Sequence, residues 1–206
     1  PKLRLWLQDS VPPSTSYEDR PGRWVAEPSW PSPNVSERPY RLGYRRLAED
    51  EVQEREETVC SPLSVGQFAG KWCSYSALPD LPHDQREEDG GSLIYDTEPM
   101  DEDMEILGAP YVDFEIAADK PVAQIAVRLS DVMPDGRATR ITYGVKNLTH
   151  RESHENPEAL EPGRFYRVRV RFNGLAHRLP KGHRLRLSVS SSYFPLIWAT
   201  PEAACL

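Results

Sequence analysis

The sequence has no long apolar run, and this absence excludes one broad class of protein. No apolar segment approaches the ~20 residues that a membrane-spanning helix needs, and no signal peptide is visible at the start. We therefore expect a cytoplasmic protein. The chain begins at Pro1 rather than at a methionine, so we expect a piece of a longer polypeptide.

Charge of one sign is not in large excess either. The chain has 32 acidic and 25 basic residues, which give a net charge of −7. Domains that bind nucleic acid usually carry a basic patch or stripe. The mildly acidic mixture therefore argues against nucleic acid as a partner.

Cysteines are few, and their spacing does not match a metal site. Cys60, Cys73 and Cys205 form an odd, scattered set. Disulfides are rare in the reducing cytosol, and unpaired spacing of this kind carries no zinc signature. We interpret all three as reduced thiols.

Motifs for catalysis and metal binding are also missing. No serine lies in a G-x-S-x-G nucleophile elbow, so we predict no catalytic residue in this chain. His150 and His154 are four residues apart, but they lie in an acidic, loop-like stretch rather than on a helix that could present a zinc site. Four aspartates lack the spacing of a calcium loop; they are Asp84, Asp89, Asp101 and Asp103. We expect no metal and no cofactor.

One short motif concerns modification rather than catalysis. Asn147-Leu148-Thr149 fits the acceptor sequence for N-glycosylation. Because no secretion signal is visible, we interpret these residues as the end of a strand.

Proline and alternating patterns are what the sequence does have. Twenty prolines disfavour long helices and favour turns and edge strands. Leu185, Leu187 and Val189 alternate with polar residues, which places the apolar set on one face of a strand. Further strands are predicted at 2–7, 40–43, 92–96, 111–117, 122–132, 138–148 and 165–172.

Strong turn signals separate several of these strands. Met133-Pro134-Asp135-Gly136 joins two of them as a hairpin, and Lys181-Gly182 precedes the strand at 185–189. Even strand spacing with long crossovers is typical of sandwiches. We predict an all-β fold, an antiparallel two-sheet sandwich of jelly-roll type.

A row of arginines alternates with the apolar residues of two strands. Arg167, Arg169 and Arg171 belong to one strand, and Arg184 and Arg186 to the other. They could form a basic face. We interpret them instead as partners of acidic neighbours on an exposed or interfacial sheet face.

The chain divides into two parts by composition. Residues 1–58 are predicted to form an extended N-terminal segment with the first strands, and residues 59–206 the core of the sandwich. Residues 59–91 form a long irregular stretch, and long ordered loops are often functional. Aromatic side chains in this stretch are expected to be covered rather than free in water; they are Phe68, Trp72 and Tyr75.

Several blocks of sequence, in order along nearly the whole chain, resemble one known family. They are Gly22-Arg23-Trp24 with Trp30-Pro31, Asp84-Gln85-Arg86, Leu129-Ser130-Asp131-Val132 through Pro134-Asp135-Gly136, Asn147-Leu148-Thr149-His150-Arg151, and Pro180-Lys181-Gly182-His183-Arg184-Leu185-Arg186-Leu187 running into Ser191-Ser192-Tyr193-Phe194-Pro195. The combination resembles the C-terminal domain of the CocE/NonD hydrolases, the X-prolyl dipeptidyl peptidase-like family.

The resemblance implies a function that composition alone does not indicate. Members are serine hydrolases of esters, amides or X-Pro peptides, with an α/β-hydrolase domain, a helical cap and a C-terminal jelly roll similar to galactose-binding domains. Their catalytic triad lies upstream of this region, and no position here matches it. The resemblance therefore implies a non-catalytic domain that packs on the α/β-hydrolase and cap domains of the same polypeptide, with self-association possible.

The family also suggests where this domain contacts substrate. One loop of the jelly roll helps to line the substrate pocket, and here the loop before Asp84-Gln85-Arg86 matches it. Phe68, Trp72 and Tyr75 are the candidates for that wall, although they could instead pack within the loop. Trp24 and Trp30 are assigned to the segment that ties the domains together.

A second function uses the same fold. A free-standing carbohydrate-binding module would present exposed tryptophans as platforms for sugars. Trp72 and Trp198 are the side chains whose exposure would matter.

Overall fold

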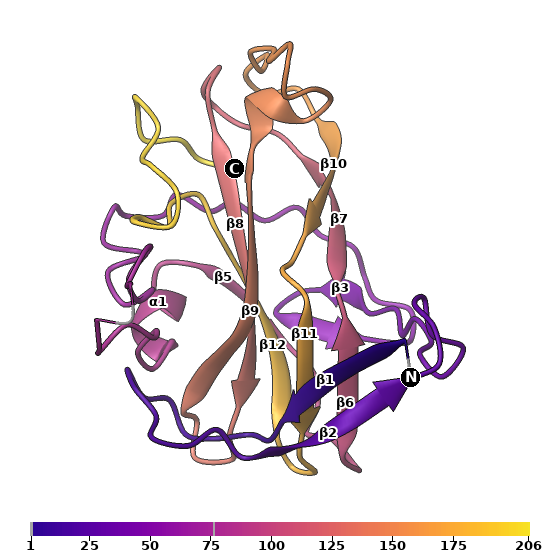
Figure 1. The fold of residues 1–206 in the computed structure, drawn as a ribbon. Helices are drawn as coiled ribbons and strands as arrows, with labels where there is room; N and C mark the ends of the chain where they lie inside the picture. The colour runs from indigo at the N-terminus through magenta and orange to yellow at the C-terminus, as the bar shows by residue number, and fades with distance from the viewer. Residues whose placement is uncertain (1, 76) are drawn as a thin grey trace.

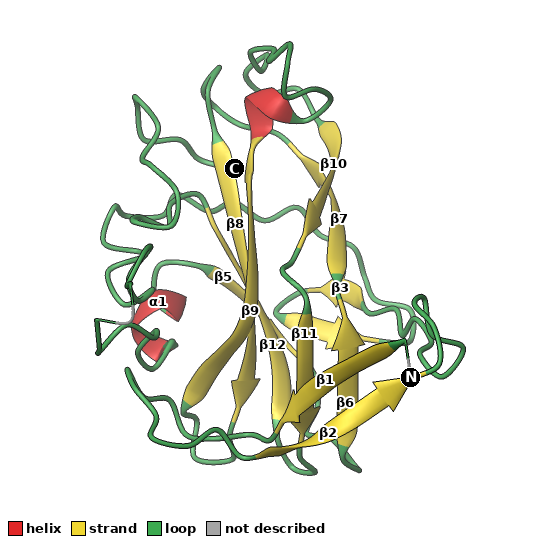
Figure 2. Cartoon of the chain, in the orientation of Figure 1, coloured by secondary structure: helices red, strands yellow, loops and turns green. Residues whose placement is uncertain are grey.

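The computed structural model describes residues 2–75 and 77–206, and its regular structure is almost entirely β-strand (Figure 1, Figure 2). A short helix, α1 (Arg86–Asp89), and a 3-10 turn, η1 (Leu148–His150), are the other regular elements of this part. The strands are β1 (Leu3–Gln8), β2 (Gly22–Glu27), β3 (Arg41–Gly43), β4 (Arg46–Ala48), β5 (Leu93–Asp96), β6 (Met104–Gly108), β7 (Tyr111–Ile116), β8 (Gln124–Val132), β9 (Ala138–Asn147), β10 (Tyr166–Arg171), β11 (Leu175–Leu179) and β12 (Arg184–Ser190).

One layer is a six-stranded sheet in the order β3-β4-β5-β12-β8-β9. In β12, Leu187 lies opposite Leu129 of β8 on one side and Tyr95 of β5 on the other. All three side chains are buried. The alternation that predicted this strand therefore directs its apolar face into the core, as expected.

The second layer consists of the sheet β2-β1-β11-β6 and the pair β10-β7. Figure 1 shows β10 and β7 continuing upward from β11 and β6. The Phe172 N–H donates to the Pro110 carbonyl at 2.9 Å, at the point where both strands break. The core lies between the two layers and includes Ile125, Val127, Val168, Val170, Leu179 and Leu187.

Four of the five arginines in the row are paired with acids, as the sequence indicated, whereas Arg171 makes no ion pair within the described residues. Arg167 binds Glu115, and Arg169 binds Asp113, on the exposed face of the β10-β7 pair. The half-buried Arg186 contacts both Asp96 and Asp89. The charges of these three arginines are neutralised within the domain, so the row does not form an open basic face.

The all-β sandwich is confirmed, with one difference in strand direction. The predicted strands lie within two residues of observed ones. Most strand pairs are antiparallel, as expected, but β1 pairs with β11 in parallel and β4 pairs with β5 in parallel. Both parallel pairings bring a strand of the N-terminal segment against a strand from much later in the chain. The jelly-roll connectivity and the likeness to galactose-binding domains stay predictions.

The interpretation of the cysteines as reduced thiols is wrong for two of the three. Cys60 and Cys205 form a disulfide, with 4.3 Å between their Cα atoms and 145 residues between them in sequence. Backbone hydrogen bonds between Val59 and Leu206 run in both directions beside it, each 2.9 Å. Cys73 is free and exposed. The bond closes the start of the long loop onto the end of the chain.

In the described part of the chain, no helix has the length and apolar character needed to cross a membrane.

Candidate functional site

The long loop before α1 is fixed at its base by a buried carboxylate. Glu88 of α1 is only 1% exposed. Its two oxygens accept the backbone N–H groups of Gly66 and Phe68, each at 2.6 Å. Charge-assisted bonds of this kind are short and strong, so the loop backbone at 66–68 has a defined position.

The helix that supplies this carboxylate is itself held by buried charge. Arg128, on the outer face of β8, is fully buried and donates to Ser92 at 2.7 Å. Its guanidinium lies 3.6 Å from Asp89 of α1, and Asp89 also accepts the Ser188 hydroxyl at 2.6 Å. Asp89 also binds Arg186, whose pKa is raised by its hydrogen bond to Asp96 and, further, by Asp89. The polar outer face of the six-stranded sheet thus anchors α1 and the loop.

The far part of the loop is closed by backbone hydrogen bonds. The Lys71 N–H donates to the Asp80 carbonyl at 2.9 Å. The N–H groups of Asp80 and Leu81 both donate to the carbonyl of Thr15, each at 3.0 Å. The N-terminal segment therefore holds the neck of the loop tip.

The tip itself presents large apolar side chains to solvent. Trp72 is 72% exposed and Tyr75 is 93% exposed. Tyr75 also has a φ of 46°, in the left-handed region that non-glycine residues rarely occupy. Such a concentration of exposed aromatics on an ordered loop is typical of a surface that another molecule or domain covers.

A second segment extends this surface. The backbone of Gly66 packs directly on Phe194, and Val65 and Ala69 share a buried cluster with Tyr193. The Phe194 ring contacts Trp198 edge-on, with 6.0 Å between centroids, and Trp198 is 82% exposed. In Figure 1 the loop, α1 and the C-terminal segment lie on the same side of the sandwich. We call the exposed set the aromatic edge, consisting of Leu63, Trp72, Tyr75, Leu78, Phe194 and Trp198.

The three side chains predicted from sequence occupy two different environments. Phe68 is half-buried at the loop base, where its ring meets His83 edge-on at 5.1 Å. Trp72 and Tyr75 project from the tip, so the expectation that they avoid water within this chain is wrong. The sequence reasoning did not single out Phe194 or Leu78 for this surface. The run of aromatics at 193–198 was the available signal for Phe194.

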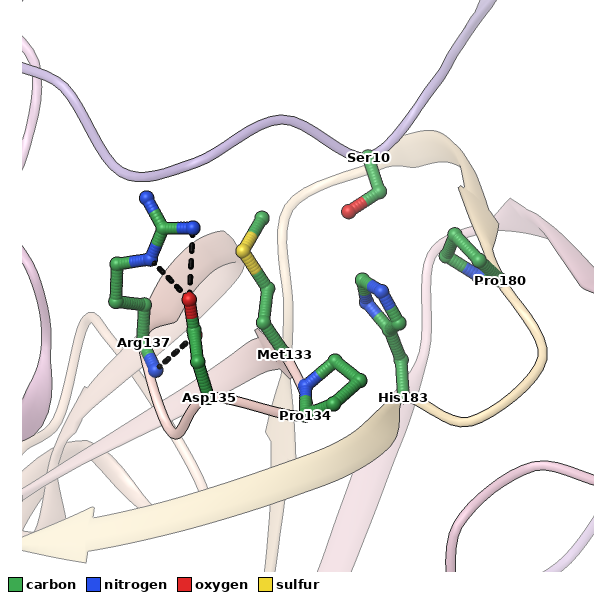
Figure 3. Close-up of a pocket in the computed structure, with 7 residues that line it drawn as sticks. All are labelled: Ser10, Met133, Pro134, Asp135, Arg137, Pro180 and His183. Atoms are coloured by element: carbon green, nitrogen blue, oxygen red, sulfur yellow. Dashed lines mark hydrogen bonds and ion pairs between the residues drawn. The ribbon is translucent and has the colours of Figure 1, made fainter.

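A small pocket lies at another part of the molecule, where the β8–β9 and β11–β12 turns meet the N-terminal segment. It is shallow, with a volume of about 370 Å³. Figure 3 shows the His183 ring and the Ser10 side chain at the same hollow. Its lining residues are Ser10, Met133, Pro134, Asp135, Arg137, Pro180 and His183.

A buried carboxylate lies behind this pocket and joins the two layers. Asp131 of β8 is fully buried; its Oδ1 lies 2.7 Å from His183 Nδ1 and its Oδ2 lies 3.0 Å from Nε2 of the buried His177 on β11. Burial alone would raise the pKa of Asp131, but contacts from His177, Ser10 and His183 outweigh it and hold that pKa below its ordinary value. The carboxylate is therefore kept charged.

This cluster does not have the arrangement of a nucleophilic triad. In a triad the serine hydroxyl binds the imidazole that the carboxylate orients. Here no hydrogen bond joins Ser10 to either imidazole within the described residues, and both oxygens of Asp131 are engaged by separate rings. The arrangement is a polar clamp between layers.

The candidate metal ligands are engaged elsewhere or stay apart. Asp89 binds Arg186, whereas Asp103 binds Arg178 and the backbone of Lys181. The rings of His150 and His154 lie 5.4 Å apart between centroids. Over residues 2–75 and 77–206, no group of three or more histidine, cysteine or acidic side chains is arranged to bind a metal ion.

The chain is similar to parts of larger hydrolytic enzymes. It matches, over residues 1–206, the family described as the X-Pro dipeptidyl-peptidase C-terminal non-catalytic domain. It is 27% identical over 188 residues to cocaine esterase from Rhodococcus sp. (strain MB1 Bresler), a match that covers 84% of this chain and 32% of that protein.

Solved structures with the same fold include an α-amino acid ester hydrolase, with a TM-score of 0.75 and 22% identity over 89% of this chain and 36% of the other. An aminopeptidase from a marine sediment archaeon, Thaumarchaeota archaeon, gives a TM-score of 0.69 at 21% identity over 89% of this chain and 36% of the other. The chain therefore spans about a third of the length of the relatives it matches.

Proposed function

Because this chain belongs to the X-Pro dipeptidyl-peptidase C-terminal non-catalytic domain family, we propose that it docks through its aromatic edge on the α/β-hydrolase and cap domains of a CocE/NonD-type serine hydrolase. The parent enzyme would cleave small ester, amide or X-Pro peptide substrates. The nucleophile would belong to the preceding part of the polypeptide, and this domain would shape one wall of the substrate pocket.

One observation carries the proposal: the aromatic edge is exposed, yet it rests on a rigid base. The base is fixed by Glu88 beneath the loop and by Arg128 beneath α1. These hydrogen bonds hold the backbone beneath the apolar surface in one conformation. A pre-organised apolar surface binds with less loss of conformational entropy, so it suits a permanent interface inside one polypeptide.

Within this surface, the side chains are assigned different roles. Trp72 and Tyr75 are proposed to line the pocket, because both are largely exposed on the tip of the long loop. Phe68 is proposed to support the loop from its base, against His83. Residues 1–58 are proposed to lead from the catalytic part into the sandwich at 59–206.

Two further expectations concern self-association of the isolated domain and the location of the protein. Self-association through the uncovered edge is expected for the isolated domain, because large exposed apolar patches favour contact. The cytoplasmic location expected from the sequence stays a prediction, and the Cys60–Cys205 disulfide argues against it.

The test compares a double and a single alanine variant in the full-length enzyme. Trp72→Ala with Tyr75→Ala should lower kcat/KM for a p-nitrophenyl ester at least tenfold. Phe165→Ala, in which a 54% exposed ring outside the edge is removed, should leave it unchanged. Hydrogen exchange at 71–79 should be slower in the full-length enzyme than in this chain alone. Equal kinetics for both variants, together with equal exchange, would refute the proposal.

The carbohydrate-binding alternative relies on the same exposed tryptophans. A glycan array probed with this chain separates the two. Binding that is lost on Trp72→Ala would support a sugar platform, whereas no binding is expected for a surface built to meet another domain.

A further inference from the structure

The segment that follows β12 and carries part of the aromatic edge is fixed at both ends to the same place. At one end Ser191 and Ser61 exchange hydrogen bonds, in which the backbone N–H of each donates to the hydroxyl of the other at 3.0 Å. At the other end the disulfide joins Cys205 to Cys60. Residues 191–205 therefore form a closed loop whose two ends lie together, as in an Ω-loop.

The second half of this loop has few other attachments. Phe194 and Trp198 lie in the loop, and the residues at 198, 199 and 201–203 are exposed. The Thr200 hydroxyl donates to the Glu202 carbonyl at 2.6 Å, within the loop itself. Among the described residues, no hydrogen bond joins 198–204 to the rest of the domain. The end of the loop at 205 is therefore the point at which this half is held.

Backbone hydrogen bonds beside the disulfide keep its two cysteines adjacent. Val59 and Leu206 exchange N–H···O bonds of 2.9 Å. The Cys205 N–H donates to the Asp119 carboxylate at 2.8 Å, and the Asp119 N–H donates to the Cys205 carbonyl at 3.2 Å. Because these bonds do not need the sulfur–sulfur bond, the two thiols stay close after reduction. The disulfide can therefore form again.

The same hydrogen bonds hold the segment less firmly than a covalent bond does. Hydrogen-bonded segments that lie near an end of regular structure open locally at low free-energy cost. With the disulfide intact, the end of the 191–205 loop cannot separate from residue 60. With the disulfide reduced, local opening of the backbone pair at Val59 and Leu206 would release it.

The disulfide is accessible to a reductant. Cys60 is exposed and Cys205 is half-buried. Exposed disulfides are the labile or regulatory ones, whereas structural disulfides resist reduction. In Figure 1 the C-terminal segment, in yellow, lies on the same side of the sandwich as α1 and the long loop. Reduction would thus act on the side that carries the aromatic edge.

We propose that the Cys60–Cys205 bond is a reversible redox latch on residues 191–205. A thiolate of a dithiol reductant attacks the Cys60 sulfur; the sulfur–sulfur bond breaks, and the Cys205 sulfur leaves as a thiolate that takes up a proton. The second thiol of the reductant then attacks the mixed disulfide and releases Cys60 as a thiol. Two electrons and two protons pass to the cysteines, and the dithiol becomes a disulfide.

The latch regulates the surface proposed above for docking, and its effect on activity rests on that proposed function. Closed, it holds Phe194 and Trp198 in the position in which the aromatic edge meets the catalytic part. Open, it lets the loop move, so docking must order the loop again. A surface that must be ordered on contact binds less tightly. Reduction is therefore expected to lower the activity of the parent enzyme, and reoxidation to restore it.

The test follows the full-length enzyme before and after treatment with dithiothreitol, with peptide-level alkylation to show which thiols are free. Reduction should make amide exchange at 198–205 about tenfold faster, because local opening becomes possible. Exchange at 124–132 in β8 should not change, which excludes general unfolding. The value of kcat/KM for a p-nitrophenyl ester should fall by about threefold, and removal of dithiothreitol under air should restore it.

Two variants separate the latch from the other thiol. Cys60→Ser with Cys205→Ser should behave like the reduced wild type, with or without dithiothreitol. Cys73→Ser, which removes the exposed free thiol, should respond to dithiothreitol as the wild type does. The reduced wild type carries the test by itself if the double variant does not fold.

Three results would overturn the inference: a native disulfide that dithiothreitol does not reduce, a reduced enzyme with unchanged exchange at 198–205, or faster exchange with unchanged kcat/KM. The last counts against the latch only if Trp72→Ala with Tyr75→Ala does lower kcat/KM. If that double variant is fully active, docking through the aromatic edge has failed instead, and the exchange at 198–205 alone decides whether the latch exists.

Discussion

Asp131 shows how one side chain connects separate parts of the sandwich. It lies on β8 and binds His177 on β11 of the other layer. It also binds His183, just before β12. A buried charge is tolerated when its hydrogen bonds are satisfied, but removal of the charge leaves partners unpaired.

Replacement of this carboxylate by an amide should be costly. Asp131→Asn places an N–H₂ group against one of two ring N–H donors, and we expect a loss of about 3–5 kcal/mol in the free energy of unfolding. Urea denaturation measures it. Asp103→Asn, at an exposed pair with Arg178, is the matched control and should lose much less. Equal losses would contradict the clamp.

The same residue predicts how stability depends on acid. The pKa of Asp131 is lower in the folded chain than its ordinary value of 3.8. The stabilisation that its charged carboxylate gives to the folded state is therefore complete above pH 3.8. It is lost as the pH falls through the lower, folded pKa. The difference in the free energy of unfolding between wild type and Asp131→Asn, measured by urea titration, should therefore become smaller as the pH falls below the ordinary pKa of 3.8. A constant gap in that range would show that the carboxylate does not carry the effect.

For single residues, the sequence predicted which strand side chains are buried, but it did not predict which loop aromatics are exposed. Alternation placed Leu185, Leu187 and Val189 correctly, since burial follows from strand period. Trp72 and Tyr75 were expected to be covered, but they are not. A single sequence cannot indicate whether an aromatic is covered by its own domain or by another part of the polypeptide.

Among the elements, the long loop and the corner at 193–198 depend on a close backbone approach. Gly66 has a φ of 114°, and a Cβ there would lie 2.0 Å from the Phe194 carbonyl oxygen. Only glycine allows both the conformation and the contact.

Gly66→Ala should therefore separate the loop from the corner. We expect about 2–4 kcal/mol of destabilisation, since backbone strain adds to overpacking. Gly136→Ala is the control, because Gly136 also has a positive φ but a Cβ added there would meet nothing within 4 Å; strain alone should cost about 1–2 kcal/mol. Thermal unfolding of both variants measures these losses. A smaller loss of stability for Gly66→Ala than for Gly136→Ala would contradict the close packing of Gly66 on Phe194.

The elements that the sequence missed are short and lack alternation. β4 has three residues, and β2, β6 and β11 carry no regular period of apolar and polar positions. They are strands because neighbours supply hydrogen bonds: β1 pairs with both β2 and β11, and β11 pairs with β6. Pairing partners far away in the sequence decide such strands, and the parallel pairings could not be predicted for the same reason.

For the whole molecule, the disulfide is the longest covalent constraint. It joins residues 145 apart, and such cross-links stabilise mainly by restricting the unfolded chain. Scattered cysteines gave no indication of this pairing, because only the fold brings them together.

Removal of the bond should lower stability without changing the fold. The double variant Cys60→Ser with Cys205→Ser should lose about 2–5 kcal/mol, measured by urea unfolding without reductant. Cys73→Ser removes an exposed free thiol and should change little. Addition of reductant to the wild type should lower its stability to that of the double variant. If reductant does not change the stability of the wild type, the bond is absent in solution.

The hydrogen bonds from Asp80 and Leu81 to Thr15 have a practical consequence for anyone who trims this domain. Residues 9–21 look dispensable, since they contain no regular strand or helix. Yet a shortened version that begins at β2 would lack Thr15 and its hydrogen bonds to Asp80 and Leu81. The loop tip that carries Trp72 and Tyr75 would then be less firmly held. Expression versions should therefore begin no later than β1.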